Sequence, residues 1–278
     1  MFAGKGKTKR VIPGFGLSMG ITLAMLSVIV LIPIASLLMS ASKLSLPEFW
    51  RIVTAKPVRY GYIVSFRCAF IAAVINSLFG VILAWVLVRY EFPGKRMLDG
   101  MIELPFALPT AVAGIALTSL CSKDGLIGKI AAKAGIQIAY TKIGITIAMV
   151  FIGIPFVVRA IQPVLEKLDP EFEEAAEMLG SDERRTFFKV IFPEILPAML
   201  TGFGLALARG VGEYGSVVFI AGNIPYKTQI APLIIMQKLE QFQYEDATAI
   251  ALVLLIISFS ILFVINLIQS YANKTTRG

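Results

Sequence analysis

Six long apolar runs constrain this chain more than any other feature of its sequence. Each run is long enough to cross the hydrocarbon core of a bilayer, which is about 30 Å thick and takes roughly 20 helical residues to span. Hydrophobic residues make up 57% of the chain and charged residues only 16%, well outside the range of a soluble domain. We therefore expect an all-α polytopic membrane protein with six transmembrane helices, at residues 11–39, 62–88, 101–121, 143–161, 198–221 and 247–269.

The charge and the rare residue types of the chain exclude several classes of function. The net charge is +8, which basic side chains facing anionic lipid explain without nucleic acid. There is no histidine, which excludes a Ser-His-Asp triad and a His-ligated zinc site. Cys68 and Cys121 lie in apolar stretches, so we expect two buried small hydrophobic residues rather than a disulfide. The sequence predicts no catalytic residue, no cofactor and no metal site.

Two glycine motifs look like nucleotide-binding signatures but lack the context that such signatures need. Gly6-Lys7-Thr8 resembles the end of a phosphate-binding loop, yet Met1 stands where that motif requires its first glycine. Residues 210–215 match a dinucleotide fingerprint, but they lie inside an apolar run and no strand precedes them. Glycines that permit close helix packing explain this second motif better. We therefore expect no nucleotide site in this chain.

The N-terminal run and the basic residues set the expected orientation. Lys and Arg precede the first run as in a signal peptide, but the run exceeds a usual signal core and no clear Ala-x-Ala cleavage site follows. We therefore expect an uncleaved first span. The Lys and Arg residues lean modestly toward the side that holds both termini and residues 163–197. This bias predicts a multi-pass protein of the plasma (inner) membrane with both termini in the cytoplasm.

Two features inside the spans are candidates for a translocation pathway or a gate. Pro105 and Pro109 lie in the third run and must interrupt or kink its helix. This irregular region is either a structural kink without a role in transport or part of the lining of a gate. Arg209 and Glu213 are spaced i, i+4 in the fifth run, where each charge would cost roughly 2.5–3.5 kcal/mol at the centre of a lipid-exposed helix. We expect either a structural ion pair between them or a water-lined path.

The longest strongly polar interval between two runs, residues 169–197, has the signals of a helix, a turn and a second helix. Asp169 is expected to cap the first helix, Pro170 to occupy its first position and Gly180 to end it. Ser181 or Asp182 can cap the second helix, which is basic. We expect this second helix to lead to a proline-marked end at Pro193 and Pro197.

The first of these two helices has the character of a docking surface. Its apolar positions recur at i, i+3, i+4 and i+7, and they are Phe172, Ala175, Ala176 and Leu179. Glutamates border this face, and anionic lipid would repel them, so a helix lying on the membrane explains it poorly. An apolar face with an acidic border suits a groove on a protein partner.

The spacing of this interval resembles the EAA loop of ABC importer permeases. Glu174-Ala175-Ala176 is followed after three residues by Gly180 and after nine more by Val190-Ile191-Phe192-Pro193. The usual motif ends in I-x-L-P, and here two apolar replacements leave the proline in place. The segments RYEFPGKRMLD, ELPFALPTAVAGIAL, IPFVVRAIQPVLEKL and RGVGEYGSVVFIAGN are similar to the sulfate/thiosulfate permeases of the CysT family. The related CysW and molybdate permeases share versions of several of these segments.

This resemblance implies a fold and a division of the chain. The fold is the MetI-like fold of type I importers. The implied divisions are a cytoplasmic tail at 1–10, the first span and outer loop at 11–58, an ABC transmembrane type-1 domain at 59–270 with its coupling loop at 163–197, and a tail at 271–278. The implied ATPase-coupling residues are Glu173, Glu174, Ala175, Ala176, Gly180 and Pro193.

The resemblance also implies a function and a set of partners. The chain would pair with a CysW-like second permease above two CysA-like ABC ATPase subunits, which would hydrolyse the ATP. A periplasmic or lipid-anchored sulfate-binding protein would deliver sulfate or thiosulfate. A molybdate or tungstate permease is the near alternative. From a different class, a channel or a secondary transporter would need no ATPase.

Overall fold

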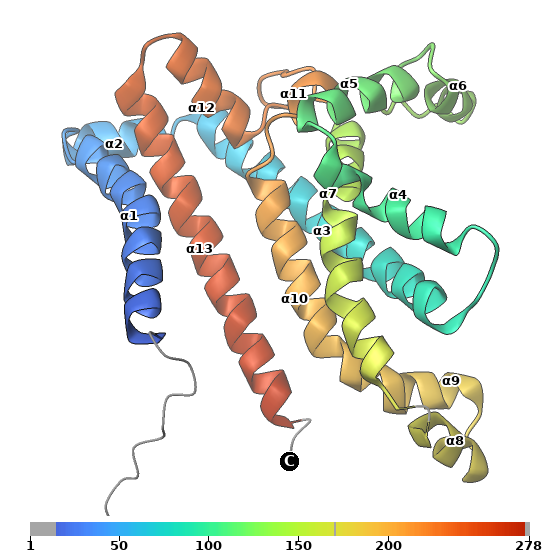
Figure 1. Cartoon of the computed structure of the whole chain (residues 1–278). Coiled ribbons are helices and arrows are strands. Elements are labelled where there is room, and N and C mark those ends of the chain that lie inside the picture. Colours follow the sequence, from blue (N-terminus) through green and yellow to red (C-terminus); the bar gives the residue numbers. More distant parts are fainter. Residues whose placement is uncertain (1–14, 170, 276–278) are drawn as a thin grey trace, which may run out of the picture.

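The computed structural model describes residues 15–169 and 171–275, and all regular secondary structure in that part is helical. The elements, labelled in Figure 1 where there is room, are α1 Phe15–Ala41, α2 Leu46–Val53, α3 Lys56–Arg89, α4 Lys95–Ala107, α5 Thr110–Cys121, α6 Leu126–Lys133, α7 Lys142–Lys167, α8 Glu171–Met178, α9 Glu183–Thr186, the π-helical turn η1 Phe187–Ile191, α10 Phe192–Val211, α11 Val217–Ile220, α12 Ala231–Glu240 and α13 Tyr244–Thr275. The predicted tail at 1–10 lies outside the described residues. Within the predicted C-terminal tail, α13 continues to Thr275.

The expected membrane spans correspond to five long apolar helices and one broken pair. The long ones are α1, α3, α7, α13 and the continuous stretch Glu183–Val211, and the pair α4 and α5 is bent by 114°. The break falls at Pro109, which immediately precedes α5, as the sequence predicted. Pro105 instead lies inside α4, so of the two expected outcomes, an interruption or a kink, the structure excludes an interruption at Pro105.

The fifth span ends ten residues earlier than predicted, at Val211 instead of Ala221. Apolar residues continue past this point, but the chain turns because the Glu213 carboxylate accepts hydrogen bonds from the Ser216 amide at 2.8 Å and from its hydroxyl at 3.0 Å. The short helix α11 follows this turn. Hydropathy alone did not reveal the turn, because a charged residue here serves as a local hydrogen-bond acceptor.

The core of the molecule is the packing of α3, α7 and α10. Small residues let these helices approach closely, as expected for helices in a membrane. A Cβ on Gly202 would lie 2.6 Å from the Cα of Val157, and a Cβ on Gly210 would lie 3.2 Å from the Cβ of Ala69. Of the glycines at 210–215, Gly210 therefore serves helix packing, as predicted. Cys68 and Cys121 are buried free thiols, as expected.

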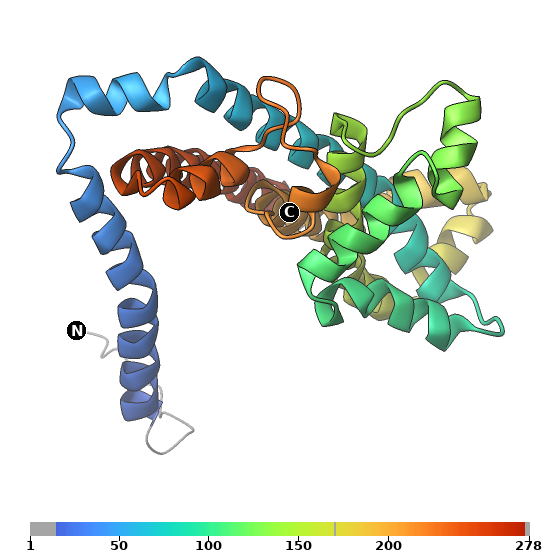
Figure 2. The ribbon, with the colours of Figure 1, turned by 90° about the horizontal axis from the view of Figure 1, so that it is seen from above.

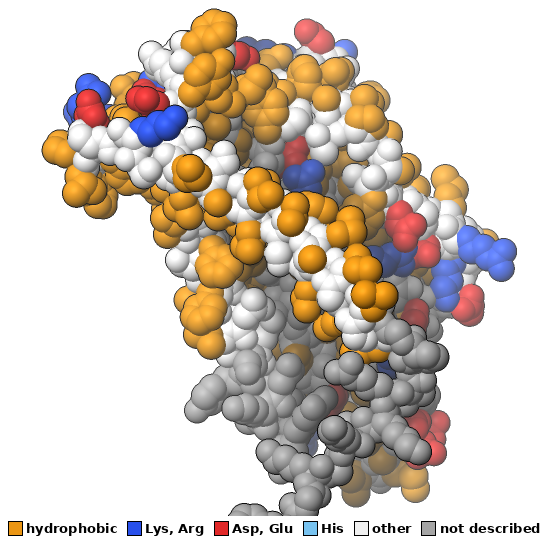
Figure 3. All heavy atoms as spheres, turned by 60° about the vertical axis from the view of Figure 1, so that its left-hand side comes forward, with side chains coloured by type: hydrophobic (Ala, Val, Ile, Leu, Met, Phe, Trp, Pro, Cys, Tyr) orange, Lys and Arg blue, Asp and Glu red, His pale blue; other side chains and the backbone are white. Residues whose placement is uncertain are grey.

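The remaining helices surround this core. Seen from above in Figure 2, α1 and α2 stand at one side, and α4, α5 and α6 lie at the other. The first residues of α1, the last of α13 and the α8–α9 segment all lie toward the same end of the bundle in Figure 1, and α2, α5, α6, α11 and α12 lie toward the opposite end. Figure 3 shows hydrophobic side chains over much of one face, with charged side chains gathered mainly near its edges. This distribution fits a surface in contact with lipid.

The helix α2 was not predicted, although its sequence carries a start signal. Ser45 and Glu48 form a capping box, in which each side chain bonds the backbone amide of the other residue. The hydrogen bond from the Ser45 hydroxyl and then that from its amide lower the pKa of the Glu48 carboxyl. Ile52 and Val53 are buried, whereas Trp50 stays exposed. The Ser-x-x-Glu spacing in residues 45–48 could have revealed this element.

Candidate functional site

The predicted docking helix is α8, and its two ends are set as the sequence indicated. An Asp169 carboxylate oxygen accepts a hydrogen bond from the Glu171 amide at 3.1 Å. At the other end Gly180 has φ +80°, its amide donates to the carbonyl of Glu177 at 2.8 Å, and the next amide donates to Ala176 at 3.0 Å. This pair of bonds is a Schellman motif, which favours glycine at its left-handed position. Pro170 lies outside the described residues.

The apolar side of α8 is open to its surroundings. No residue of this helix is buried. Phe172 is 59% exposed and Leu179, which follows the helix, is 89% exposed. Large apolar side chains that project from the polar end of a membrane protein mark a site of interaction with another molecule. The predicted apolar face therefore exists and has no partner within the described chain.

The second half of the loop differs from its prediction at the prolines. Asp182 caps α9 by accepting a hydrogen bond from the Arg185 amide at 3.1 Å, as expected. No helix end occurs at Pro193 or Pro197, however, because Pro193 lies in the first turn of α10 and Pro197 inside it. The wide π-helical turn η1 precedes Pro193 and joins α9 to α10. Proline has no backbone N–H to donate, and a π-helical turn changes the pattern of backbone hydrogen bonds around it. The loop thus continues directly into the fifth span.

One predicted coupling residue also contacts the transmembrane body. Glu173 of α8 forms an ion pair with Arg89, the last residue of α3. The Arg89 guanidinium carbon lies 5.5 Å from the centre of the Trp85 ring, within the range of a cation–π interaction. Glu174 and Ala175 remain exposed and Ala176 is half-buried. Sequence reasoning missed Arg89, because no local pattern links it to a residue so far along the chain.

The structure brings the two predicted pathway elements together. A Cβ on Gly215 would lie 2.1 Å from the Thr110 hydroxyl, and a Cβ on Gly114 would lie 2.5 Å from the Ser216 carbonyl oxygen. The start of α5, just after Pro109, therefore lies against the turn that Glu213 organises. Pro105 is also buried, three residues before the break in the helix pair.

Arg209 and Glu213 form an ion pair with each other, which settles whether the two side chains meet. The sequence predicted both residues inside a span, but the structure places them at its end. Arg209 is in the last turn of α10, and Glu213 lies beyond the end of that helix. The Glu213 side chain is 2% exposed and that of Arg209 is 34% exposed. The carboxylate is thus almost fully buried, and the guanidinium reaches toward the surface of the chain.

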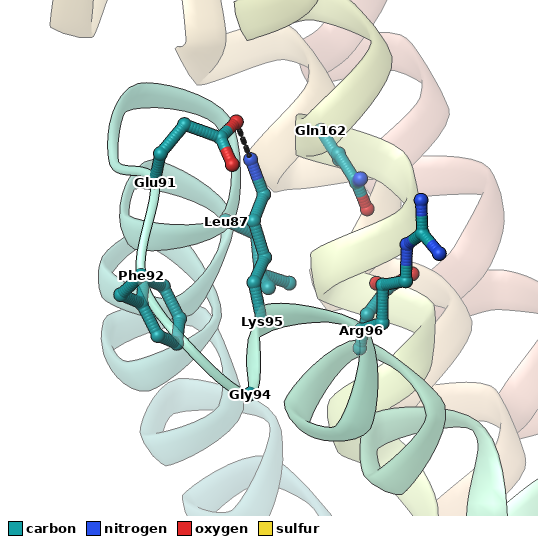
Figure 4. Close-up of a pocket in the computed structure, with 8 residues that line it drawn as sticks. Leu87, Glu91, Phe92, Gly94, Lys95, Arg96 and Gln162 are labelled. Atoms are coloured by element: carbon teal, nitrogen blue, oxygen red, sulfur yellow. Dashed lines mark hydrogen bonds and ion pairs between the residues drawn. The ribbon is translucent and has the colours of Figure 1, made fainter.

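A second charged group lies between α4 and α7, where sequence reasoning expected nothing. Arg159 of α7 contacts Asp99 at 2.8 Å and Glu103 at 2.8 Å. Next to it a cavity of about 510 Å³ opens between the end of α3, the following turn, the first half of α4 and α7. Figure 4 shows Glu91 facing Lys95 on one side of this cavity, and Arg96 and Gln162 on the other. Acidic and basic side chains are mixed around it, so it has no clear preference for an anion.

Similarity to known proteins agrees with the fold and extends over most of the chain. The family model described as "Binding-protein-dependent transport system inner membrane component" matches residues 76–278. The chain is 47% identical over 271 residues, 98% of each sequence, to the "Sulfate transport system permease protein CysT" of Escherichia coli (strain K12). It is 48% identical over 254 residues to the protein of the same name from Synechocystis sp. (strain ATCC 27184 / PCC 6803 / Kazusa), which covers 91% of this chain and 89% of that one.

Solved structures support the architecture independently of close sequence similarity. A chain of a bacterial ABC transporter involved in the import of the acidic polysaccharide alginate superposes with a TM-score of 0.75 at 11% identity, covering 92% of this chain and 94% of that one. A chain of the MetNI methionine ABC transporter in an inward-facing conformation gives a TM-score of 0.59 at 16% identity, covering 82% and 99%. The fold is therefore the MetI-like permease fold predicted from the loop motif. The chain belongs to the family of inner membrane components of binding-protein-dependent transport systems, and within that family to the CysT permeases.

Proposed function

We propose that this chain is the permease subunit of an ATP-driven sulfate importer and forms half of the translocation pathway. The observation that carries the proposal is 47% identity across 98% of the chain to a CysT sulfate permease. Two features of the molecule support it: helices long enough to cross a membrane, and a polar helix that projects from one end of the bundle. ATP hydrolysis belongs to a separate subunit in transporters of this family.

The same proposal assigns the coupling role to α8 and its Schellman turn. The exposed face of Phe172 and Leu179 would enter a groove on a CysA-like ATPase, and the glutamates bordering it, Glu174 among them, would meet basic groups there. Ala175 and Ala176 would let the helix lie close to the groove. Gly180 and the unbroken path through Pro193 would then carry the ATPase movement into α10.

The remaining partners follow from the assembly of a type I importer. A CysW-like permease would supply the other half of the pathway, and a periplasmic or lipid-anchored sulfate-binding protein would deliver sulfate or thiosulfate at the end opposite α8. An ATPase acts in the cytoplasm, so α8 and both termini would lie on that side of the plasma (inner) membrane. The excess of Lys and Arg on this side agrees with the orientation.

The pathway itself would run past the contact between the start of α5 and the turn after α10. Pro109 lies at the break between α4 and α5, next to this contact, and the Arg209–Glu213 pair holds the turn in place. A broken helix that frees backbone groups is tolerated at membrane depth only where protein or a water-filled cavity receives them. Pro105 and Pro109 would therefore belong to a gate lining, with Arg209 the group that presents positive charge nearby.

Transport in a host that lacks its own sulfate and molybdate systems tests this proposal. The chain is expressed with a CysW-like permease, a CysA-like ATPase and a sulfate-binding protein, and uptake of labelled sulfate is measured against unlabelled sulfate, thiosulfate and molybdate. We expect uptake that requires the ATPase and that excess sulfate suppresses more strongly than molybdate. Stronger suppression by molybdate would overturn the assignment to sulfate, and uptake without the ATPase would overturn the assignment to an ATP-driven importer.

A further inference from the structure

The α8 helix is poorly anchored by packing, so its polar contacts decide where it lies. None of its residues is buried. A cavity of about 540 Å³ separates the loop from α3, and it is lined by Trp85, Tyr90, Glu173, Glu177, Glu183, Phe187 and neighbouring residues. Space of that size provides few of the close contacts that fix a packed helix. The position of α8 against the bundle therefore depends on the polar contacts beside this cavity.

Arg89 joins the two sides beside this cavity, through contacts with two of its lining residues, Glu173 on α8 and Trp85 on α3. Its guanidinium forms the ion pair with Glu173, and among the described residues this is the ion pair that joins α8 to a membrane-spanning helix. The side chains of both partners are largely shielded, at 20% exposed for Arg89 and 27% for Glu173. Shielding of this kind reduces screening by salt, which makes the contact stronger than a surface pair.

Aromatic packing connects Arg89 to the other side of the loop. The guanidinium lies over Trp85, one turn earlier on α3. The Trp85 ring in turn meets the Phe187 ring of η1 edge to face, with the ring centres 5.5 Å apart. The chain of contacts from Glu173 through Arg89 and Trp85 to Phe187 therefore closes the loop onto the end of α3.

The charges around the cavity make this cation hard to replace. Glu173, Glu177 and Glu183 all line the space, and Arg184 is the basic residue of the loop that lines it with them. Without Arg89 the three carboxylates would keep Arg184 as their cation within the loop but would have no cation on α3 to attract them, and their mutual repulsion would be less compensated. Removal of Arg89 should thus loosen the helix as well as break one pair.

We propose that Arg89 is a positioning residue that ties the coupling helix to α3, so that a displacement of α8 reaches α3 directly as well as α10 through the loop. The inference rests on the proposed coupling role of α8. Because α3 packs along both α7 and α10, a push at Arg89 would move the core as a unit. In this arrangement α8 has two mechanical connections to the bundle, one through the backbone and one through an ion pair.

A distance measurement tests the anchor independently of transport. Spin labels are placed at Met178→Cys, which is 90% exposed, and at Phe79→Cys on α3, which is 56% exposed, with Cys68 and Cys121 replaced by alanine in the full assembled complex. We expect one narrow distance distribution in the parent, a clearly broader one in Arg89→Gln, and a narrow one again in the charge-swapped Arg89→Glu/Glu173→Arg. The matched control is Lys95→Gln, which breaks the exposed pair between Lys95 and Glu91 and should leave the distribution narrow. Identical distributions in the parent and Arg89→Gln would overturn the proposal.

A functional measurement on the same variants tests the consequence. Arg89→Gln should retain ATPase subunits and basal hydrolysis, but the stimulation of hydrolysis by the loaded binding protein should fall about tenfold, a change typical of a lost coupling between sites. The charge swap should restore at least part of it. If the binding protein stimulates hydrolysis in Arg89→Gln as strongly as in the parent, the proposed role of Arg89 is contradicted. The proposed function would be unaffected, because it rests on sulfate uptake by the parent. A parent complex without ATPase on α8 would instead contradict the proposed function.

Discussion

The packed core and the coupling loop are held in opposite ways. In the core, α3, α7 and α10 approach so closely that a Cβ on Gly202 would lie 2.6 Å from the backbone of α7. In the loop, α8 has no buried residue and is held by an ion pair beside a cavity. The core is therefore suited to moving as one body, and the loop is suited to being gripped by another protein.

Because of this difference, substitutions in the core and in the loop should affect different properties, namely the stability of the chain and its coupling to a partner. A residue of the core contributes to the stability of the chain itself, since its contacts lie within the chain. An exposed residue of α8 contributes little to that stability, and its effect should appear only when the partner is present. The account therefore predicts that stability and coupling respond to different sets of residues.

The largest loss of stability is expected at the buried carboxylate beside the core. Arg209→Ala would leave Glu213 charged and 2% exposed without its cation, which costs about 3 kcal/mol or more when a buried pair is broken. Thermal unfolding of the purified complex measures this loss. The double variant Arg209→Ala/Glu213→Gln should recover most of it, because no buried charge remains. If the recovered double variant fails to import sulfate, the Arg209–Glu213 pair acts in the pathway. An Arg209→Ala protein of parental stability would contradict the ion-pair account.

Two polar residues on α3 should differ although both are buried. The Ser65 hydroxyl oxygen accepts a hydrogen bond from the Ala231 amide at 2.8 Å, whereas the Asn76 amide has no partner among the described residues. Ser65→Ala should cost about 1–3 kcal/mol because it leaves a buried amide unpaired, and Asn76→Ala no more than about 1 kcal/mol because no hydrogen bond is lost. Equal losses in a denaturation assay would show that Asn76 is paired in the assembled transporter.

The smallest effect on stability is expected on the exposed face of α8. Phe172→Ala and Leu179→Ala should change the stability of the chain by less than about 0.5 kcal/mol, yet weaken binding of the ATPase subunit by more than about 1 kcal/mol. Leu78→Ala is the matched control, since Leu78 is 63% exposed but lies on the membrane-spanning part of α3. Affinity capture of the ATPase at graded concentrations separates the two sites. Equal capture by all three variants would remove α8 as the docking surface.

The sequence was most informative where a local physical rule acts alone. Hydropathy located the spans, the left-handed requirement located the end of α8 at Gly180, and side-chain capping located Asp182. These rules depend on neighbours within a few residues, so no tertiary knowledge was needed.

The errors had two sources: local turns that hydropathy and proline signals do not describe, and contacts between residues distant in sequence. The fifth span was extended too far because hydropathy ignores the turn that Glu213 builds. Pro193 and Pro197 were assigned to a helix end, although η1 lets the helix continue through them. Arg89 and Arg159 could not be assigned partners from sequence, since each pairs with an acid 60 or more positions away.

The central claim is that α8 transmits the work of an ATPase to the packed core, and Gly180 tests it most directly. Nothing lies within 4 Å of a Cβ at this position, but its φ of +80° strains a β-branched residue, so Gly180→Val should disturb the turn and spare the fold. Gly180→Asn, which tolerates this conformation, is the control. ATP hydrolysis and sulfate uptake are measured together in reconstituted complexes. The account predicts that Gly180→Val hydrolyses ATP with little uptake while Gly180→Asn approaches the parent, and parental uptake per ATP in Gly180→Val would contradict it.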